Sequence, residues 1–220
     1  MKQQFVVVGL GRFGGAVCKT LVELGHEVIG IDRNMRRVQE FSGMLPFVYE
    51  ADSTDEGVLR ELGVHNVDHA IVAIGDDLQA SILTTLILKD LGVPTVTAKA
   101  ASEYHRRVLE RIGADHIVQP ERDTGVRVAH RLTNKNFVDY LELSPEFSLV
   151  EVVAPKEMHG KSLKQLNVRA KYGCNIVAIR HTDNTVNVSP LADDVIREGD
   201  VLVIIGSNHD INRYEKRFED

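Results

Sequence analysis

Residues 6–15 read VVVGLGRFGG. An apolar run leads into Gly9, Gly11 and Gly14 at the spacing G-x-G-x-x-G, and a helix is predicted from about Arg12. Gly9 permits a tight turn, Gly11 lets the backbone approach a pyrophosphate, and Gly14 lets the helix pack close to the strand. The free amide groups and the dipole of the helix would face the phosphates. This stretch therefore predicts the phosphate-binding turn of a dinucleotide-binding fold.

The alternation of strand and helix continues to about residue 118. Four helical patterns each end with an apolar residue and a glycine: Leu24-Gly25, Leu62-Gly63, Leu91-Gly92 and Ile112-Gly113. Glycine fits this place because the residue that closes a helix often adopts a left-handed conformation. A short β-rich run follows each helical pattern, and two more such runs lie at 5–11 and 46–52, so that strand and helix alternate six times. Apolar strands that alternate with helices indicate a doubly wound parallel sheet. We expect a Rossmann-like α/β nucleotide-binding domain over residues 1–118.

The pattern changes beyond this domain. A connecting helix is predicted within residues 119–139, and the segment 161–173 reads as a short helical passage. Ser144-Pro145 marks a turn between two predicted strands. Further strands and a polar closing helix follow, at 174–181, 185–190, 200–207 and 209–220. We expect a second, small α+β domain over residues 140–220.

The composition limits the possible functions. The chain has 220 residues and a net charge of −6, and this acidic excess argues against nucleic-acid binding. No apolar run reaches the ~18 residues of a membrane span, and the start lacks the layout of a signal peptide. Cys18 and Cys174 have no metal-ligand spacing and are interpreted as reduced thiols. We expect a cytoplasmic protein that reaches a membrane only by docking onto another protein.

Two residues near the glycine turn bear on which nucleotide is bound. Asp32 ends the second predicted strand, close to the usual ~20 residues after the glycines, and such a carboxylate accepts hydrogen bonds from a ribose diol. Arg12 lies inside the glycine motif. A guanidinium there suits a terminal phosphate better than a neutral nicotinamide, which favours ATP and ADP over NAD(H). A solvent-facing arginine is the alternative.

Further candidates follow the other strands, because ligands of open α/β sheets bind at the carboxyl ends of the strands. For several of them a structural role is the alternative. Asp52 and Ser53 could cap the next helix, Lys99 could be a solvated charge, and Glu121 could suit the helix dipole alone. Asp76 or Asp77 is predicted to be a helix cap. The candidate set also contains Phe13, Arg33, Asn34, Ala73, Ile74 and Gly75.

No catalytic constellation accompanies these candidates. His105, His116 and His130 are scattered and show no pairing of a base with an orienting group. The glycine loop lacks the Lys-Ser/Thr ending of a nucleotide-hydrolysing P-loop. We therefore interpret the chain as a sensor and not as an enzyme. The alternative is an NAD(H)-binding redox sensor or a small NAD(P)-dependent oxidoreductase.

Four stretches resemble one family in order and over essentially the whole chain: VVVGLGRFGGAVCKTL, VAIGDDLQASILTTLILKDLG, HRRVLERIGADHIVQPERDTG and LNVRAKYGCNIVAIR. They are similar to the KtrA-type RCK (KTN) regulatory subunits of bacterial Ktr potassium uptake systems. The resemblance implies a homodimer that assembles into a homo-octameric ring beneath a potassium-conducting membrane subunit of the KtrB type. A relative of the TrkA type that responds to NADH, and a cyclic-dinucleotide receptor without a transporter, are further alternatives.

The resemblance also implies how ligands act. ATP and ADP would bind the N-terminal domain and favour different ring shapes, with Arg12 contacting the terminal phosphate across the dimer interface. Glu121 would help hold a divalent cation, Mg²⁺ or Ca²⁺, while Asp32 and Asn34 match the ribose and adenine end and Lys99 lines the nucleotide. Arg33 stands where some relatives have an apolar residue, and it could stack on adenine or accept a 2′-phosphate. The C-terminal domain would bind cyclic di-AMP at Asn167, Val168, Arg169, Ala170, Asn175, Ile176 and Pro190.

Overall fold

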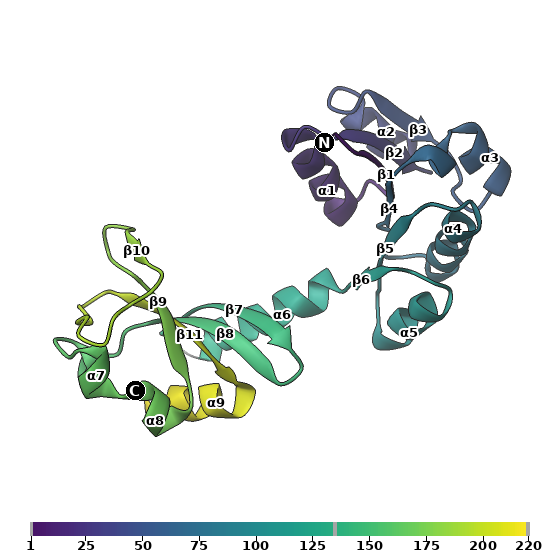
Figure 1. Ribbon diagram of the computed structural model, residues 1–220. Coiled ribbons are helices and arrows are strands. Elements are labelled where there is room, and N and C mark those ends of the chain that lie inside the picture. The colour runs from purple at the N-terminus through teal and green to yellow at the C-terminus, as the bar shows by residue number, and fades with distance from the viewer. Residues whose placement is uncertain (1, 134–135, 219–220) are drawn as a thin grey trace. The chain divides into compact units, whose positions relative to one another are not determined.

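The computed structural model describes residues 2–133 and 136–218, and the chain forms two compact units, Met1–Glu121 and Arg122–Asp220 (Figure 1). Each unit has its own sheet and its own hydrophobic core. The predicted fold class, a Rossmann-like parallel sheet followed by a small α+β domain, is confirmed.

The sheet of the first unit has six parallel strands in the order β3-β2-β1-β4-β5-β6. The strands are β1 Gln4–Val8, β2 Glu27–Asp32, β3 Phe47–Glu50, β4 His69–Val72, β5 Thr95–Lys99 and β6 His116–Val118. Strand β1 pairs with β2 on one side and with β4 on the other. The order of the strands reverses at this point, and a crevice for ligands opens at the carboxyl ends of strands on either side of such a reversal.

Helices cover both faces of this sheet. They are α1 Arg12–Glu23, α2 Met35–Phe41, α3 Glu56–Glu61, α4 Leu78–Asp90 and α5 Glu103–Arg111, with a 3₁₀ turn at Val64–Asn66. Successive side chains of β1 point to opposite faces: Phe5 and Val7 pack with Cys18 of α1, whereas Val6 and Val8 pack with Leu88 of α4. The four predicted helix-closing glycines all have positive φ angles.

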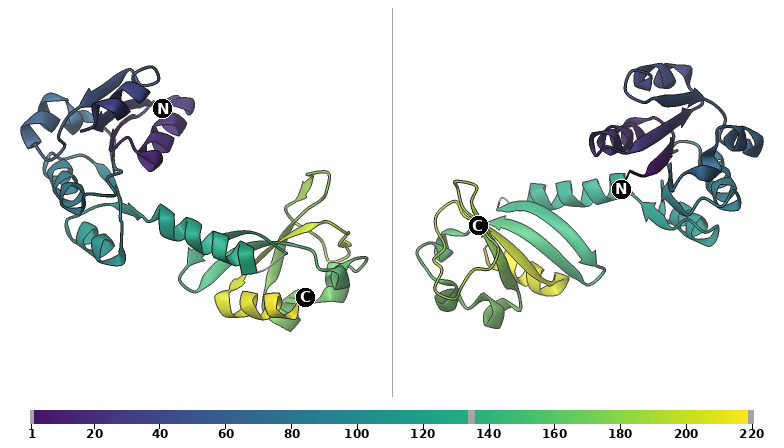
Figure 2. Two further views of the ribbon diagram at one scale, coloured as in Figure 1. Left: turned by 180° about the vertical axis from the view of Figure 1, so that it is seen from behind. Right: turned by 45° about the horizontal axis from the view of Figure 1, so that its top comes forward.

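The second unit begins with most of α6, Pro120–Thr133, which has no buried residue. Its antiparallel sheet has the order β10-β9-β11-β8-β7, with β7 Phe137–Ser144, β8 Phe147–Val153, β9 Asn175–Arg180, β10 Val186–Asn187 and β11 Val201–Ser207. Helix α9, Asn208–Arg217, packs on β8 and β11 through Ile211 and Tyr214 (Figure 2). A 3₁₀ turn lies at Lys156–Met158.

The predicted helical passage at 161–173 is two short helices, α7 Leu163–Leu166 and α8 Val168–Tyr172. They meet at Asn167, whose φ and ψ are both 46°. This left-handed conformation ends one helix and starts the next, and asparagine tolerates it better than most residues. Ser162 and Gln165 form a capping box at the start of α7.

Candidate nucleotide-binding site

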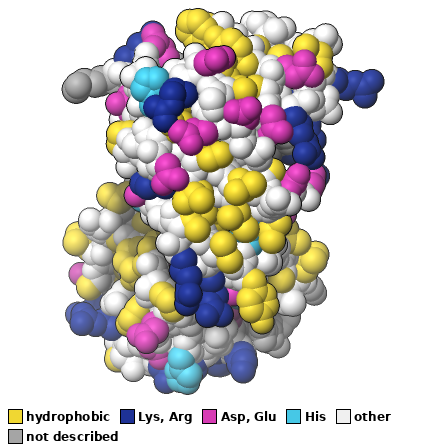
Figure 3. All heavy atoms as spheres, turned by 90° about the vertical axis from the view of Figure 1, so that its right-hand side faces the viewer, with side chains coloured by type: hydrophobic (Ala, Val, Ile, Leu, Met, Phe, Trp, Pro, Cys, Tyr) yellow, Lys and Arg dark blue, Asp and Glu magenta, His cyan; other side chains and the backbone are white. Residues whose placement is uncertain are grey.

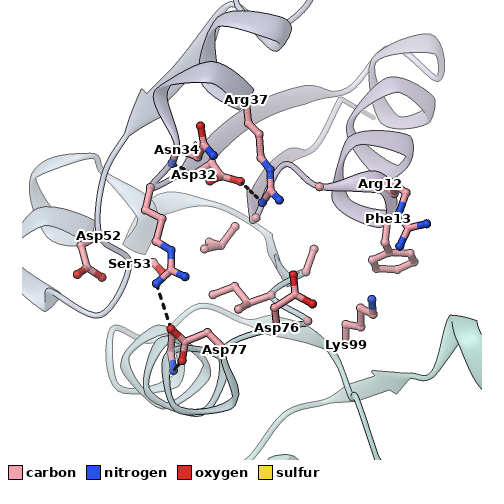
Figure 4. A pocket seen from close by; sticks show the side chains of 18 of the residues that line it. Arg12, Phe13, Asp32, Asn34, Arg37, Asp52, Ser53, Asp76, Asp77 and Lys99 are labelled. Carbon is pink, nitrogen blue, oxygen red and sulfur yellow. Dashed lines mark hydrogen bonds and ion pairs between the residues drawn. The ribbon is translucent and has the colours of Figure 1, made fainter.

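A cavity of about 430 Å³ lies at the carboxyl ends of the parallel strands (Figure 4). Every candidate nucleotide-binding residue of the first domain lines it, except Gly14. The lining also contains residues that the sequence analysis did not assign to the nucleotide: Val8, Arg37, Ala51, Asp76, Asp77 and Ala80.

The glycine turn has the roles expected from its spacing. Gly9 has φ 94°, and a Cβ there would stand 3.1 Å from the carbonyl carbon of Ala73. A Cβ on Gly14 would overlap the carbonyl oxygen of Gly9, so Gly14 permits the contact between helix and strand instead of lining the cavity. Gly11 is the N-cap of α1 and supplies no side-chain hydrogen bond. The amide groups of the first turn of α1 are therefore left for a bound anion.

Asp32 is almost completely buried and connects two segments of the cavity wall. Its Oδ2 accepts hydrogen bonds from the amide of Leu10 at 2.7 Å and from Arg37 at 3.3 Å. Its Oδ1 accepts one from the amide of Asn34 at 2.9 Å. A carboxylate has about four acceptor positions. Asp32 thus holds the glycine turn against the start of α2 and keeps capacity for one ribose hydroxyl.

Arg33, the residue after β2, and Asp77, the residue before α4, form an ion pair in the wall of the cavity. The Arg33 guanidinium lies 3.0 Å from the Asp77 carboxylate (Figure 4). Asp77 is also the N-cap of α4, and its side chain accepts a hydrogen bond from the amide of Ala80. That bond is the main reason that the pKa of Asp77 is lowered. The prediction of a helix cap at Asp76 or Asp77 is confirmed for Asp77.

Asp52 and Ser53, which follow β3, do not cap the next helix, which was the structural alternative for them. Asp55, and not Asp52 or Ser53, is the N-cap of α3. Hydrogen bonds from the Thr54 hydroxyl and amide to the Asp52 carboxylate lower the pKa of Asp52. Ser53 is buried, and its hydroxyl lies 2.7 Å from that of Thr84 on α4. Both Asp52 and Ser53 therefore line the cavity without a capping role.

Lys99 is not the solvated charge that was one alternative for it. Its side chain is 12% exposed, and Nζ lies 2.5 Å from Oε1 of Glu121 in the first turn of α6. This bond is the main cause of the lowered pKa of Glu121. Lys99 Nζ also lies 6.0 Å from the centre of the Phe13 ring. Arg12 is exposed at the start of α1 on the same side of the cavity (Figure 4).

No group of three or more His, Cys, Asp or Glu side chains among the described residues could hold a metal ion. His105 is buried and its Nδ1 accepts a hydrogen bond from the amide of Ala101, so it packs inside the first unit instead of lining the cavity. No helix in the described part of the chain has both the length and the apolar character needed to cross a membrane.

A second cavity, of about 170 Å³, lies in the C-terminal unit. Of the predicted cyclic di-AMP positions, Ala170 and Pro190 do not line it. Its lining residues are Leu163, Asn167, Val168, Arg169, Cys174, Asn175 and Ile176. Cys174 and Cys18 are both free and buried, and burial raises the pKa of the Cys174 thiol to about 11. A thiol with such a pKa stays protonated at neutral pH.

Comparison with known families matches both units. The TrkA-N domain model matches residues 5–120, and the TrkA-C domain model matches residues 147–219. The chain therefore belongs to the family of proteins that combine a TrkA-N domain with a TrkA-C domain.

Within this family, the chain is similar over nearly its whole length to Ktr proteins of Bacillus subtilis (strain 168). It is 55% identical to Ktr system potassium uptake protein C, with 99% of this chain and 98% of that protein covered. It is 47% identical to Ktr system potassium uptake protein A, with 97% and 96% covered. The resemblance to KtrA-type subunits is thereby confirmed.

A solved structure, the GsuK RCK domain, has the same fold. It matches with a TM-score of 0.72 at 17% identity, covering all of this chain and 48% of that chain. This chain thus spans about half the length of that solved chain.

Proposed function

We propose that this protein is the regulatory subunit of a Ktr-type potassium uptake system, and that it gates a membrane transporter in response to ATP and ADP. The observation that carries the proposal is the cavity at the start of α1, which combines an uncapped helix N-terminus with Asp32 and an exposed Arg12. The Ktr relatives supply the context of potassium uptake. The protein works in the cytoplasm and reaches the inner face of the membrane through a KtrB-type partner.

Discrimination between ATP and ADP is assigned to Arg12. A ligand shifts a conformational equilibrium only by its difference in affinity for the two states, and the γ-phosphate is the difference between the two nucleotides. The exposed Arg12 guanidinium is free to reach a γ-phosphate bound in a neighbouring copy of the chain. Two nucleotides that face each other would bring their phosphates close, and arginines together with a cation near Glu121 would offset this repulsion.

Assembly into dimers and then into an octameric ring would use the exposed apolar side chains of the first unit. Helices α4 and α5 expose Leu83, Leu86, Tyr104 and Val108. Figure 3 looks onto the side of the molecule where these helices lie and shows hydrophobic side chains gathered between charged ones. Exposed apolar groups of this kind mark surfaces that pack on other protein surfaces.

Cyclic di-AMP is the ligand proposed for the second cavity. The exposed surface of this cavity carries Arg169, whose guanidinium can pair with a phosphate, and Asn175, whose amide can hydrogen-bond a base. A volume of about 170 Å³ is small for a whole cyclic dinucleotide. We therefore expect two copies of the C-terminal unit to complete the site together.

Calorimetric titration of the wild type and of Arg12→Ala with ATP, ADP, NADH and cyclic di-AMP tests the proposal. The wild type is expected to bind ATP and ADP and to bind NADH poorly. Arg12→Ala should lower the affinity for ATP more than the affinity for ADP. Arg36→Ala is the matched control, because Arg36 is exposed on α2 but does not line the cavity. Preferential binding of NADH, unchanged by Arg12→Ala, would instead support an NAD(H)-binding redox sensor.

A further inference from the structure

Arg37 is the third residue of α2, and its side chain lines the cavity. Its guanidinium lies 3.3 Å from Oδ2 of Asp32 on one side. On the other side, a Cβ placed on Gly11 would meet the Arg37 guanidinium at 3.8 Å. Figure 4 shows the Arg37 side chain pointing to the space between Asp32 and the glycine turn. The proposed function assigns no role to the Arg37 guanidinium.

The two neighbours of Arg37 define a position along a bound nucleotide. Asp32 is the group placed to hold the ribose, and Gly11 is the point where the backbone approaches the phosphates. A side chain that contacts Asp32 and lies beside Gly11 stands at the junction of ribose and phosphate. The amides of the first turn of α1 converge on the same region, because Gly11 is their N-cap. A phosphate linked directly to the ribose would therefore meet a guanidinium from α2 and amide donors from α1.

We propose that Arg37 binds the ribose-linked phosphate of the adenine nucleotide, and that its ion pair with Asp32 is exchanged for this contact when the nucleotide binds. This inference rests on the proposed function. AMP, ADP and ATP share the phosphate in question. Arg37 therefore contributes equally to the affinity for all three and does not discriminate ATP from ADP, which is the role of Arg12.

Adenosine separates the two contacts of Arg37. It offers a ribose to Asp32 but no phosphate to Arg37. The ion pair with Arg37 takes one of the two Asp32 acceptor positions that the two hydroxyls of a ribose diol would use. Removal of the guanidinium leaves this acceptor free. Removal of the Arg37 guanidinium should therefore lower the affinity for AMP, ADP and ATP, whereas the affinity for adenosine should stay the same or rise.

The test is calorimetric titration of the full chain with adenosine, AMP, ADP and ATP. For Arg37→Met we expect a roughly tenfold loss of affinity for AMP, ADP and ATP alike, the usual size for one charge-assisted hydrogen bond. Adenosine should bind as well as to the wild type, or more tightly. Arg37→Lys should recover part of the loss, because lysine keeps the charge without the planar fork.

Arg36→Met is the matched control, since Arg36 precedes Arg37 on α2 and does not line the cavity. It should leave all four affinities unchanged. Thermal unfolding of each variant checks that the fold is retained, as expected for two exposed side chains.

Three results would overturn the inference while leaving the proposed function in place. An equal loss of affinity for adenosine and for ADP in Arg37→Met would mean that Arg37 acts only by positioning Asp32. Loss of ATP without loss of ADP would place Arg37 at the terminal phosphate. Unchanged nucleotide affinities would mean that Arg37 does not contact the ligand. If the wild type bound none of these nucleotides, the proposed function would fail first, and the inference would fail with it.

Discussion

Lys99 Nζ lies 2.5 Å from Oε1 of Glu121, and this ion pair joins the end of β5 to the first turn of α6. Lys99 is mostly buried, whereas the Glu121 side chain is 68% exposed. A cation that approaches Glu121 from solvent therefore competes with a lysine that approaches it from the cavity. Occupancy of the nucleotide site and occupancy of the cation site should consequently influence each other.

Glu121→Gln should remove the dependence of ATP binding on a divalent cation. In the wild type, Mg²⁺ or Ca²⁺ is expected to tighten ATP binding several-fold relative to a chelator. The glutamine keeps the shape of the side chain but has no charge to offer, so the gain should disappear. Titration with ATP in the presence and absence of the cation measures this, and Glu61→Gln on α3 is an exposed control outside the cavity. A full cation effect in Glu121→Gln would refute the assignment of the cation to Glu121.

Gly14→Ala should strongly destabilise the first unit. The added methyl would overlap the Gly9 carbonyl oxygen, which belongs to the backbone and has no freedom to rotate away. We expect a loss of about 3 kcal/mol or more in the free energy of unfolding. Chemical denaturation measures it. Gly43→Ala is the control, because a Cβ there meets nothing within 4 Å, and it should change stability by less than about 1 kcal/mol.

Protonation of His105 should destabilise the fold in acid. Burial lowers the pKa of this histidine, and its Nδ1 lone pair accepts a hydrogen bond from the Ala101 amide. Above the ordinary histidine pKa the side chain is neutral in both states, and the full stability is present. As the pH falls below that value, the unfolded chain takes up the proton first, so the free energy of unfolding decreases.

Thermal unfolding from about pH 7 to about pH 5 measures this effect. His105→Asn keeps an acceptor near the position of Nδ1 but does not titrate there, so its melting temperature should fall less steeply than that of the wild type. His65→Asn, at an exposed position, should keep the wild-type slope. A wild-type slope in His105→Asn would show that other groups set the pH dependence.

Asn167 allows its conformational role to be separated from a role in binding cyclic di-AMP. Asn167→Gly accepts a φ of 46° without strain, whereas Asn167→Ala should cost about 1 kcal/mol of stability. If the side chain contacts the ligand, both variants lose affinity for cyclic di-AMP, although only the alanine variant loses stability. Wild-type affinity in Asn167→Gly would limit Asn167 to shaping the turn between α7 and α8.

The sequence predicts this fold well because local and long-range signals agree. Each strand of the first unit is a short β-rich run, and each helix-closing glycine has the left-handed conformation that its position predicts. The passage at 161–173 is helical as predicted, but it is divided into two helices at Asn167. Its apolar spacing fits one helix, but Asn167 adopts a left-handed conformation, which periodicity alone does not reveal.

The candidate site was predictable where it depends on where strands end. Asp32 and Lys99 are both the last residues of their strands, and parallel strands bring their carboxyl ends to one edge. Arg37 was missed, because it lies within a helix and reaches the cavity only through a long side chain. The pairing of Lys99 with Glu121 was also missed, since it depends on how far β5 and α6 are apart in space.

Helix α2 has seven residues, of which Val38 alone is buried. Apart from Val38 and Phe41, which packs against the core, its side chains can therefore change without disturbing the packing beneath. By contrast, Asp32 and the glycine turn are tied to the backbone and tolerate little. If Arg37 binds the ribose-linked phosphate as proposed, changes on this one short surface helix would alter the affinity for nucleotides while the rest of the domain stays as it is.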